Sequence, residues 1–150
     1  MVPIKRILLV EDDQKDIELT VTALSEYNLA NEIAIAHDGV EALDYLYRRG
    51  AFAQRPDDKP LVILLDLKMP RLDGIQVLKQ LKADEQMCYI PVVILTSSRE
   101  SRDLEECYKL GVNAYVVKPV RFTAFVEAVK QIGVFWALIN EPPPGSVQRG

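Results

Sequence analysis

An unbroken apolar run from Leu61 to Leu65 ends at the carboxylate of Asp66 and is followed by a turn sequence from Met69 to Gly74. A continuous apolar run bounded by turn residues predicts a strand that is buried on both faces, as in a parallel sheet. Ligands of parallel α/β sheets bind just beyond the carboxyl ends of the strands. Asp66 is therefore a candidate for a functional site, provided that other segments bring matching chemistry to the same edge.

Further apolar runs have the length and pattern of strands, at Ile7–Val10, Ile33–Ala36, Ile90–Leu95 and Ala114–Val117. A segment with apolar residues at helical spacing follows each strand, and the last helix is predicted to span about 123–139. Gly50 is expected to end the second helix, and 50–60 to form a long loop before the Asp66 strand. Alternating strands and helices predict one α/β domain with a parallel sheet, over 1–140, followed by a proline-rich tail over 141–150.

The composition excludes several classes of protein. The chain has 150 residues, 49% of them hydrophobic and 27% charged, with a net charge of −4, which is typical of a globular domain. It has no basic run, which argues against nucleic-acid binding, and no apolar segment long enough to span a bilayer. Its start lacks the features of a signal peptide, so we expect a cytoplasmic protein with Cys88 and Cys107 as reduced thiols. His37 has no His or Cys companion and is not expected to bind a metal.

Polar side chains follow four of the predicted strands, and a parallel sheet would place them on one edge. They are Glu11, Asp12 and Asp13 after the first strand, Asp66 after the third, Thr96 after the fourth and Lys118 after the fifth. Crowded carboxylates repel one another, and Mg²⁺, which prefers carboxylates, water and phosphate oxygens, would relieve that repulsion. A hydroxyl and an ammonium add donors for phosphoryl oxygens, and a carboxylate can itself be the nucleophile, which gives an aspartyl phosphate.

Each of these residues has a plainer interpretation when it is taken alone. Acids after the first strand can simply cap the following helix, and Asp66 can be a turn residue. Thr96 alone carries little information, and most lysines are solvated. The combination of acid, acid, hydroxyl and ammonium on four strand ends is what favours a site for phosphoryl transfer.

The motifs that carry this chemistry resemble the receiver domain of two-component response regulators. They are Ile7-Leu8-Leu9-Val10-Glu11-Asp12, Leu65-Asp66-Leu67-Lys68-Met69-Pro70, Asp73-Gly74, Val93-Ile94-Leu95-Thr96-Ser97 and Ala114-Tyr115-Val116-Val117-Lys118-Pro119. The resemblance covers about residues 5–132, in order and with fitting intervals. It implies a flavodoxin-like, doubly wound sheet with strand order 2-1-3-4-5; the chemotaxis receiver of this family is a standard example of that order.

The resemblance also implies roles for the acidic residues. Asp66 would be the phosphoacceptor, and Mg²⁺ would be held by Asp12, Asp66 and the backbone carbonyl of Lys68. Glu11 would bind the metal through a water molecule, whereas Asp13 falls outside the usual acid pair. A receiver of this kind is a signalling protein that catalyses only its own phosphotransfer and dephosphorylation, and is not otherwise an enzyme.

The remaining motif residues would respond to the phosphoryl group. Thr96 and Lys118 would contact its oxygens, and the Lys118–Pro119 peptide bond is expected to be cis. Tyr115 matches the aromatic switch position, which turns inward when Thr96 moves; its plainer interpretation is a core tyrosine. Lys68 and Ser98 are expected to overhang the phosphoryl group and to influence water access. Lys68 is also expected to alter the lifetime of the aspartyl phosphate.

The end of the chain suggests a partner surface. The last predicted helix becomes apolar all round, and Phe135, Trp136 and Leu138 would form an exposed patch. We expect a symmetric homodimer through this helix, with packing against the protein's own tail as the alternative. The long loop and this extension resemble single-domain receivers that partner phytochrome histidine kinases in cyanobacteria and other bacteria. We expect no second domain after residue 140, and therefore expect the signal to act through protein contacts or further phosphotransfer.

Three other functions fit the sequence less well. A phosphatase of the haloacid dehalogenase type would need a second Asp two residues after the nucleophile, where Lys68 stands. A flavodoxin-type electron carrier would need a phosphate-binding loop after the first strand, and this loop is acidic. A dimeric binding module with a receiver fold that is never phosphorylated remains the alternative, and it should gain no Mg²⁺ affinity from its acids.

Overall fold

The computed structural model describes residues 6–27, 29, 33–56, 58–97, 102–112, 114–133 and 138. Within them, five parallel strands lie in the order β2-β1-β3-β4-β5. The strands are β1 (Ile7–Val10), β2 (Ile33–Ala36), β3 (Val62–Asp66), β4 (Val92–Thr96) and β5 (Ala114–Val117). The helices are α1 (Gln14–Leu24), α2 (Gly39–Tyr47), α3 (Gly74–Lys82), α4 (Arg102–Lys109) and α5 (Phe122–Gln131). The predicted fold class and the strand order that the resemblance implied are confirmed.

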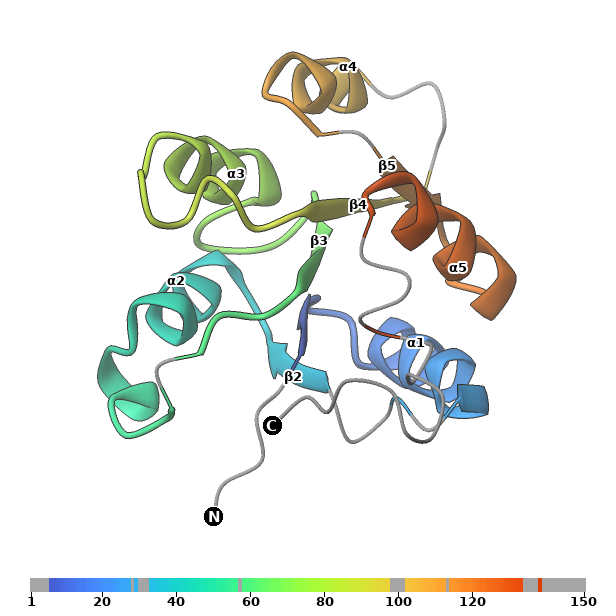
Figure 1. The fold of residues 1–150 in the computed structure, drawn as a ribbon, viewed down its shortest axis with the longest axis horizontal. Coiled ribbons are helices and arrows are strands. Elements are labelled where there is room, and N and C mark those ends of the chain that lie inside the picture. The colour runs from blue at the N-terminus through green and yellow to red at the C-terminus, as the bar shows by residue number, and fades with distance from the viewer. Residues whose placement is uncertain are drawn as a thin grey trace, which may run out of the picture.

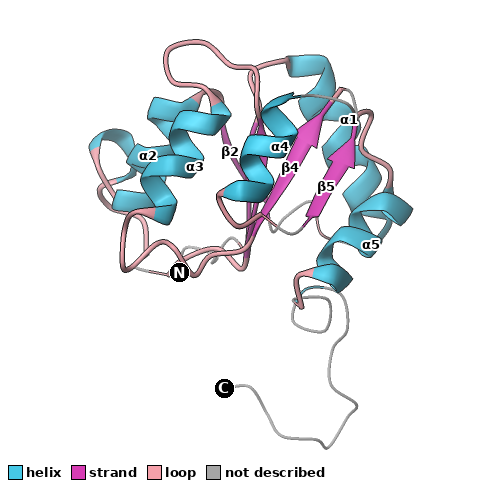
Figure 2. Ribbon diagram, turned by 90° about the horizontal axis from the view of Figure 1, so that it is seen from above, coloured by secondary structure: helices cyan, strands magenta, loops and turns pink. Residues whose placement is uncertain are grey.

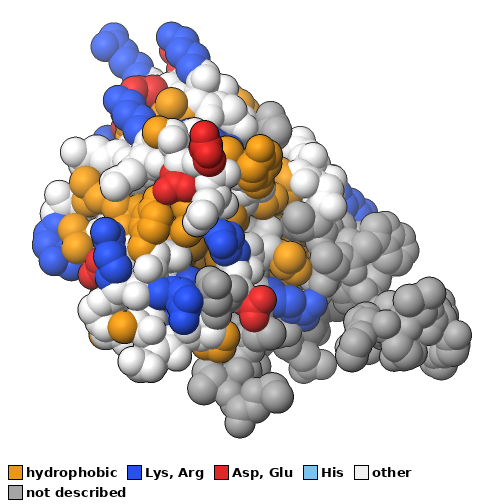
Figure 3. Space-filling view, turned by 60° about the vertical axis from the view of Figure 1, so that its left-hand side comes forward, with side chains coloured by type: hydrophobic (Ala, Val, Ile, Leu, Met, Phe, Trp, Pro, Cys, Tyr) orange, Lys and Arg blue, Asp and Glu red, His pale blue; other side chains and the backbone are white. Residues whose placement is uncertain are grey.

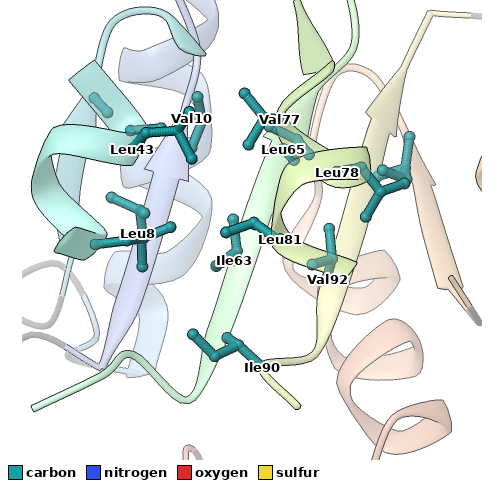
Figure 4. Close-up of a cluster of buried hydrophobic side chains, with 14 of the residues drawn as sticks. Leu8, Val10, Leu43, Ile63, Leu65, Val77, Leu78, Leu81, Ile90 and Val92 are labelled. Carbon is teal, nitrogen blue, oxygen red and sulfur yellow. The ribbon is translucent and has the colours of Figure 1, made fainter. Parts of the chain in front are cut away.

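The helices cover both faces of the sheet, with α2, α3 and α4 on one side and α1 and α5 on the other (Figures 1 and 2). Side chains of a strand alternate between its faces, so each strand contributes to two hydrophobic clusters. In β1, Leu8 and Val10 face α2 and α3, whereas Ile7 and Leu9 belong to the cluster under α1 and α5. Figure 4 shows the first cluster, in which Leu65 of β3 lies near Val77 of α3. Burial on both faces explains the unbroken apolar runs of the sequence.

The surface of the α2 and α3 side carries charges of both signs. Figure 3 brings this side forward and shows Lys and Arg side chains in separate groups, with acidic and hydrophobic side chains between them. The described side chains in this view form no continuous basic stripe, which agrees with the net charge of −4. None of the helices described is long and apolar enough to cross a membrane.

Helix α5 is shorter than the predicted span of about 123–139. Helix α5 ends at Gln131, and Gly133 has a left-handed backbone with φ of 81°. A glycine in this conformation commonly ends a helix, so the stop signal was present in the sequence. Leu138 is only 3% exposed and packs in the cluster under α1 and α5, so it does not contribute to an exposed patch of the chain. The other predicted patch residues, Phe135 and Trp136, and the proline-rich tail lie outside the described residues.

The end of the second helix was also predicted at the wrong residue. Helix α2 ends at Tyr47, and Arg48 adopts the left-handed conformation with φ of 56°, although it is not a glycine. Gly50, also at positive φ, instead begins a short 3₁₀ helix, η3 (Gly50–Phe52), inside the predicted long loop.

Arg55 organises the rest of this loop. Its guanidinium donates hydrogen bonds to the backbone carbonyls of Tyr45, Leu46, Pro56 and Asp58, at 2.6–3.2 Å. It also lies over the Tyr45 ring, 4.3 Å from the ring centre. The planar guanidinium of one arginine therefore holds the loop between α2 and β3 against the end of α2.

We expect Arg55→Ala to lower the free energy of unfolding by about 2 kcal/mol, because several partly buried carbonyls lose charged donors at once. Arg55→Lys should recover little of this, since an ammonium cannot reproduce the planar guanidinium. Urea unfolding of both variants measures the effect. Arg49→Ala is the control, because Arg49 is 55% exposed, and the loss of its ion pair with Asp44 and of its contact with the Tyr47 ring should cost no more than about 1 kcal/mol. Equal midpoints for Arg55→Ala and Arg49→Ala would contradict the role of Arg55.

Candidate functional site

The carboxyl ends of four strands meet at one edge of the sheet, as the sequence predicted. Leu65 of β3 pairs with Val10 of β1, and Asp66 pairs with Leu95 of β4. Thr96 of β4 pairs with Val117 of β5, the residue before Lys118. A cavity of about 510 Å³ opens here, and its polar lining includes Glu11, Asp12, Asp13, Asp16, Asp66, Lys68, Thr96, Ser97 and Lys118.

Three of the acids form a compact group. One carboxylate oxygen from each of Glu11, Asp12 and Asp66 lies within 4.8 Å of the others. Glu11 is 1% and Asp66 4% exposed, so two carboxylates are placed close together away from water. Burial raises the pKa of Glu11 to about 7, the negative charge of Asp66 adds to the rise, and the contact with Lys118 works against it. The group therefore favours a bound cation or a bound proton.

These residues fit a hard dication such as Mg²⁺. Glu11 Oε1 is buried, and its 2.8 Å contact with Lys118 Nζ has the distance of an ion pair without hydrogen-bond geometry. Within the described chain this oxygen has the ion pair with Lys118 and no hydrogen bond of good geometry, so it can also accept a hydrogen bond from a metal-bound water. Mg²⁺ in proteins is typically held by one or two carboxylates, keeps several waters and takes a phosphate oxygen, and this cavity offers both the acids and the room.

Asp13 has a structural role instead. Its side chain accepts a hydrogen bond from the backbone N–H of Asp16 and so caps α1. Its own N–H donates to Glu11 Oε2, at 3.2 Å, which holds that carboxylate in place. The sequence assigned Asp13 no metal contact, and its capping contact agrees with this.

Lys118 is the cation of the site. It follows β5, its backbone N–H donates to the Thr96 carbonyl at 2.8 Å, and its peptide bond to Pro119 is cis. Its Nζ lies 3.1 Å from Asp66 Oδ1. Burial alone would lower the pKa of Lys118, but the carboxylates of Glu11 and Asp66 outweigh this and raise that pKa. The ammonium therefore stays charged beside the candidate phosphoacceptor.

Thr96 and Tyr115 stand on adjacent strands. Thr96 is buried at the end of β4 and lines the cavity. Tyr115 is half-buried on β5, on the face that α4 covers, and its ring meets the ring of Tyr108 edge-on with centroids 6.3 Å apart. These positions suit the predicted switch pair, whose movement stays a prediction.

Lys68 contacts a different partner from the one that the sequence suggested. It lines the cavity, but its side chain is 81% exposed and its Nζ lies 2.8 Å from Asp103 Oδ2 of α4. The other position expected to overhang the site, Ser98, lies outside the described residues.

Asp16 is a site residue that the sequence reasoning missed. It stands on the first turn of α1, lines the cavity and accepts a hydrogen bond from Lys118 Nζ at 3.2 Å. A signal was present, because Asp16 lies in the first turn of the helix that directly follows Glu11 and Asp12, and so stands near the same edge of the sheet.

Comparisons with known proteins agree with this geometry. A family model described as response regulator receiver domain matches residues 7–130. The response regulator Rcp1 of Synechocystis sp. is 37% identical over 134 residues, which cover 89% of this chain and 90% of that protein.

Solved structures of similar proteins share the fold. The bacteriophytochrome response regulator RtBRR is 55% identical with a TM-score of 0.83, over 96% of this chain and 87% of that one. The phosphorylated cyanobacterial phytochrome response regulator RcpA is 37% identical with a TM-score of 0.73, over 94% and 99% of the two chains. The Mn²⁺-bound form of Rcp1 is 35% identical with a TM-score of 0.72, over the same shares. The chain belongs to the family of response regulator receiver domains.

Proposed function

We propose that this receiver accepts a phosphoryl group on Asp66 from a phosphohistidine of a histidine kinase, in a Mg²⁺-dependent reaction, and signals through protein contacts. The observation that carries this proposal is the position of Asp66. Its carboxylate is buried beside Glu11, Asp12 and the ammonium of Lys118, and it lines a cavity large enough for a phosphoryl group. A capping or turn residue would need none of these neighbours.

The residues present account for the steps of such a transfer. An Asp66 oxygen attacks phosphorus, a P–O bond forms, and the P–N bond to the imidazole breaks with its electron pair returning to nitrogen. Bound Mg²⁺, held by Asp12, Asp66 and the Lys68 carbonyl with Glu11 reaching it through water, would offset the negative charge of the phosphoryl oxygens. Lys118 and Thr96 would then hold two of these oxygens. The movement of Thr96 would draw Tyr115 inward, which shifts the population between two states of the α4 and β5 face.

The relatives support the finer parts of this proposal. RcpA has a structure in a phosphorylated form and Rcp1 one with a bound divalent metal, Mn²⁺. RcpA and RtBRR are named as response regulators of phytochromes, which favours a phytochrome histidine kinase as partner. Residence in the cytoplasm would follow from such a partner. A homodimer involving Phe135 and Trp136 remains part of the proposal on the sequence pattern alone.

Acetyl phosphate provides a direct test. The full chain is incubated with acetyl phosphate and Mg²⁺, and its intact mass is recorded at short times. We expect a single phosphoryl adduct on the wild type and none on Asp66→Asn or in the presence of a chelator. Asp58→Asn is the matched control, since Asp58 is exposed and outside the cavity, and it should be phosphorylated normally. A wild type that gains no adduct would favour the binding module that is never phosphorylated.

A further inference from the structure

Asp16 of α1 accepts a hydrogen bond from the ammonium of Lys118. Lys118 Nζ lies within ion-pair distance of three carboxylate oxygens, at 2.8 Å from Glu11, 3.1 Å from Asp66 and 3.2 Å from Asp16. The contact with Asp16 Oδ2 also has the angles of a hydrogen bond, which Lys118 Nζ donates. The ammonium of the resting protein is therefore aimed at α1 as well as held by the buried acids.

Of these three partners, Asp16 is the easiest for Lys118 to leave. Its side chain is 31% exposed, whereas that of Glu11 is 1% and that of Asp66 6% exposed. A carboxylate that reaches water loses little when its cation departs, but a buried carboxylate is left uncompensated. Phosphorylation turns the Asp66 carboxylate into an uncharged acyl group, so Glu11 and Asp16 remain as the carboxylate partners of Lys118, and the exposed Asp16 is the one that a phosphoryl oxygen displaces.

A phosphoryl group on Asp66 would also be an anion near Asp16. Asp16 and Asp66 line the same cavity, so a phosphoryl group there adds negative charge near the carboxylate of Asp16. Asp16 therefore disfavours the phosphorylated state in two ways: it competes for Lys118, and it repels the phosphoryl oxygens.

We propose that Asp16 is a brake on phosphorylation: it holds Lys118 in the unphosphorylated state and gives it up when a phosphoryl oxygen takes its place. This inference rests on the proposed function, in which Asp66 is the acceptor. The covalent step itself is unchanged, since with acetyl phosphate a P–O bond to Asp66 forms, the P–O bond to the acetyl group breaks and acetate leaves.

The test compares wild type and Asp16→Asn, titrated with acetyl phosphate at fixed Mg²⁺ and read by intact mass. Asparagine keeps the size of the side chain and an acceptor oxygen but removes its charge. We expect the phosphorylated-to-unphosphorylated ratio at a given donor concentration to rise about threefold to fivefold, which is what a partly exposed ion pair is worth. The difference between the ratios of Asp16→Asn and the wild type should become smaller at high ionic strength. Salt screens both the contact of Asp16 with Lys118 and its repulsion of the phosphoryl oxygens. Glu18→Gln is the matched control, since it removes one charge from an exposed position of the same helix and should leave the ratio unchanged.

The outcomes separate the brake from the receiver function. If the wild type is phosphorylated and Asp16→Asn gives an equal or lower ratio, the brake is rejected and the receiver function stands. If the wild type takes up no phosphoryl group, the proposed function is rejected and the brake with it. Urea unfolding of Asp16→Asn checks that the fold is intact; a purely structural Asp16 would change this midpoint and leave the salt dependence of phosphorylation as in the wild type.

Discussion

Replacing Gly74 by alanine is expected to cost at least about 3 kcal/mol of unfolding free energy, at or beyond the upper end of what overpacking costs. A Cβ on Gly74 would lie 2.3 Å from the carbonyl oxygen of Asp66 and 2.8 Å from Cα of Leu67. Both are backbone atoms, so no side chain can rotate away. The Gly74 N–H also donates to the Leu67 carbonyl, which fixes α3 against the end of β3. The clash therefore moves either the helix or the strand end that carries Asp66.

Urea unfolding measures this cost, and Gly50→Ala is the control. Gly50 also lies where an alanine is strained, at φ of 57°, but its Cβ would meet only a side-chain oxygen of Asp44 at 3.7 Å. Gly50→Ala should therefore lose only about 1 kcal/mol, from backbone strain. Gly39→Ala should behave like Gly74→Ala, because its Cβ would lie 2.1 Å from the Leu72 carbonyl oxygen. If Gly74→Ala unfolded at the same urea concentration as Gly50→Ala, the close approach of α3 to β3 would be wrong.

The sequence predicted the edge of the sheet well because one physical rule governs it. The carboxyl ends of parallel strands lie at one edge of the sheet, so Asp66, Thr96 and Lys118 could be placed near one another before any contact was known. The apolar runs were equally informative. A strand that is covered on both faces is apolar along its whole length, so it can be recognised without an alternating polar and apolar pattern. The sequence-based strand bounds accordingly lie close to the observed ones.

The errors lie where a local signal competes with packing. Gly133 ends α5, but the apolar residues beyond it suggested that the helix continued. Arg48 follows the last residue of α2 in the left-handed conformation, which favours glycine. Because Gly50 lies nearby, the end of the helix was predicted at Gly50 instead. Contacts between distant segments, such as Lys68 with Asp103 on α4, depend on how the helices dock, which no pattern along the chain reveals.

The second large effect is expected for Lys118→Met, which keeps the length of the side chain and removes its charge. Glu11 and Asp66 would then remain buried without their cation. Breaking a buried ion pair from one side costs about 3–5 kcal/mol, and we expect a loss of this size at pH 8. Without the ammonium, the pKa of Glu11, already raised to about 7 by burial, would rise further.

The pH dependence of this variant follows from that shift. A carboxyl whose pKa is higher in the folded than in the unfolded protein makes the folded state bind more protons, so its stability falls as the pH rises from the unfolded pKa through the folded one. Lys118→Met should therefore lose much less stability at pH 5 than at pH 8. Mg²⁺ should raise its unfolding midpoint at pH 8 more than that of the wild type, because the metal would replace the missing positive charge.

Urea unfolding at pH 5 and pH 8, with and without Mg²⁺, measures these effects against Lys15→Met, which removes one charge from an exposed position of α1. That control should follow the wild type at both pH values, because a solvated lysine compensates no buried acid. If Lys118→Met were as stable as the control at pH 8, the carboxylates would not depend on Lys118 for their burial. Such a result would mean that protons already neutralise the acidic group in the resting protein, and it would leave little charge at the site to bind Mg²⁺ at neutral pH.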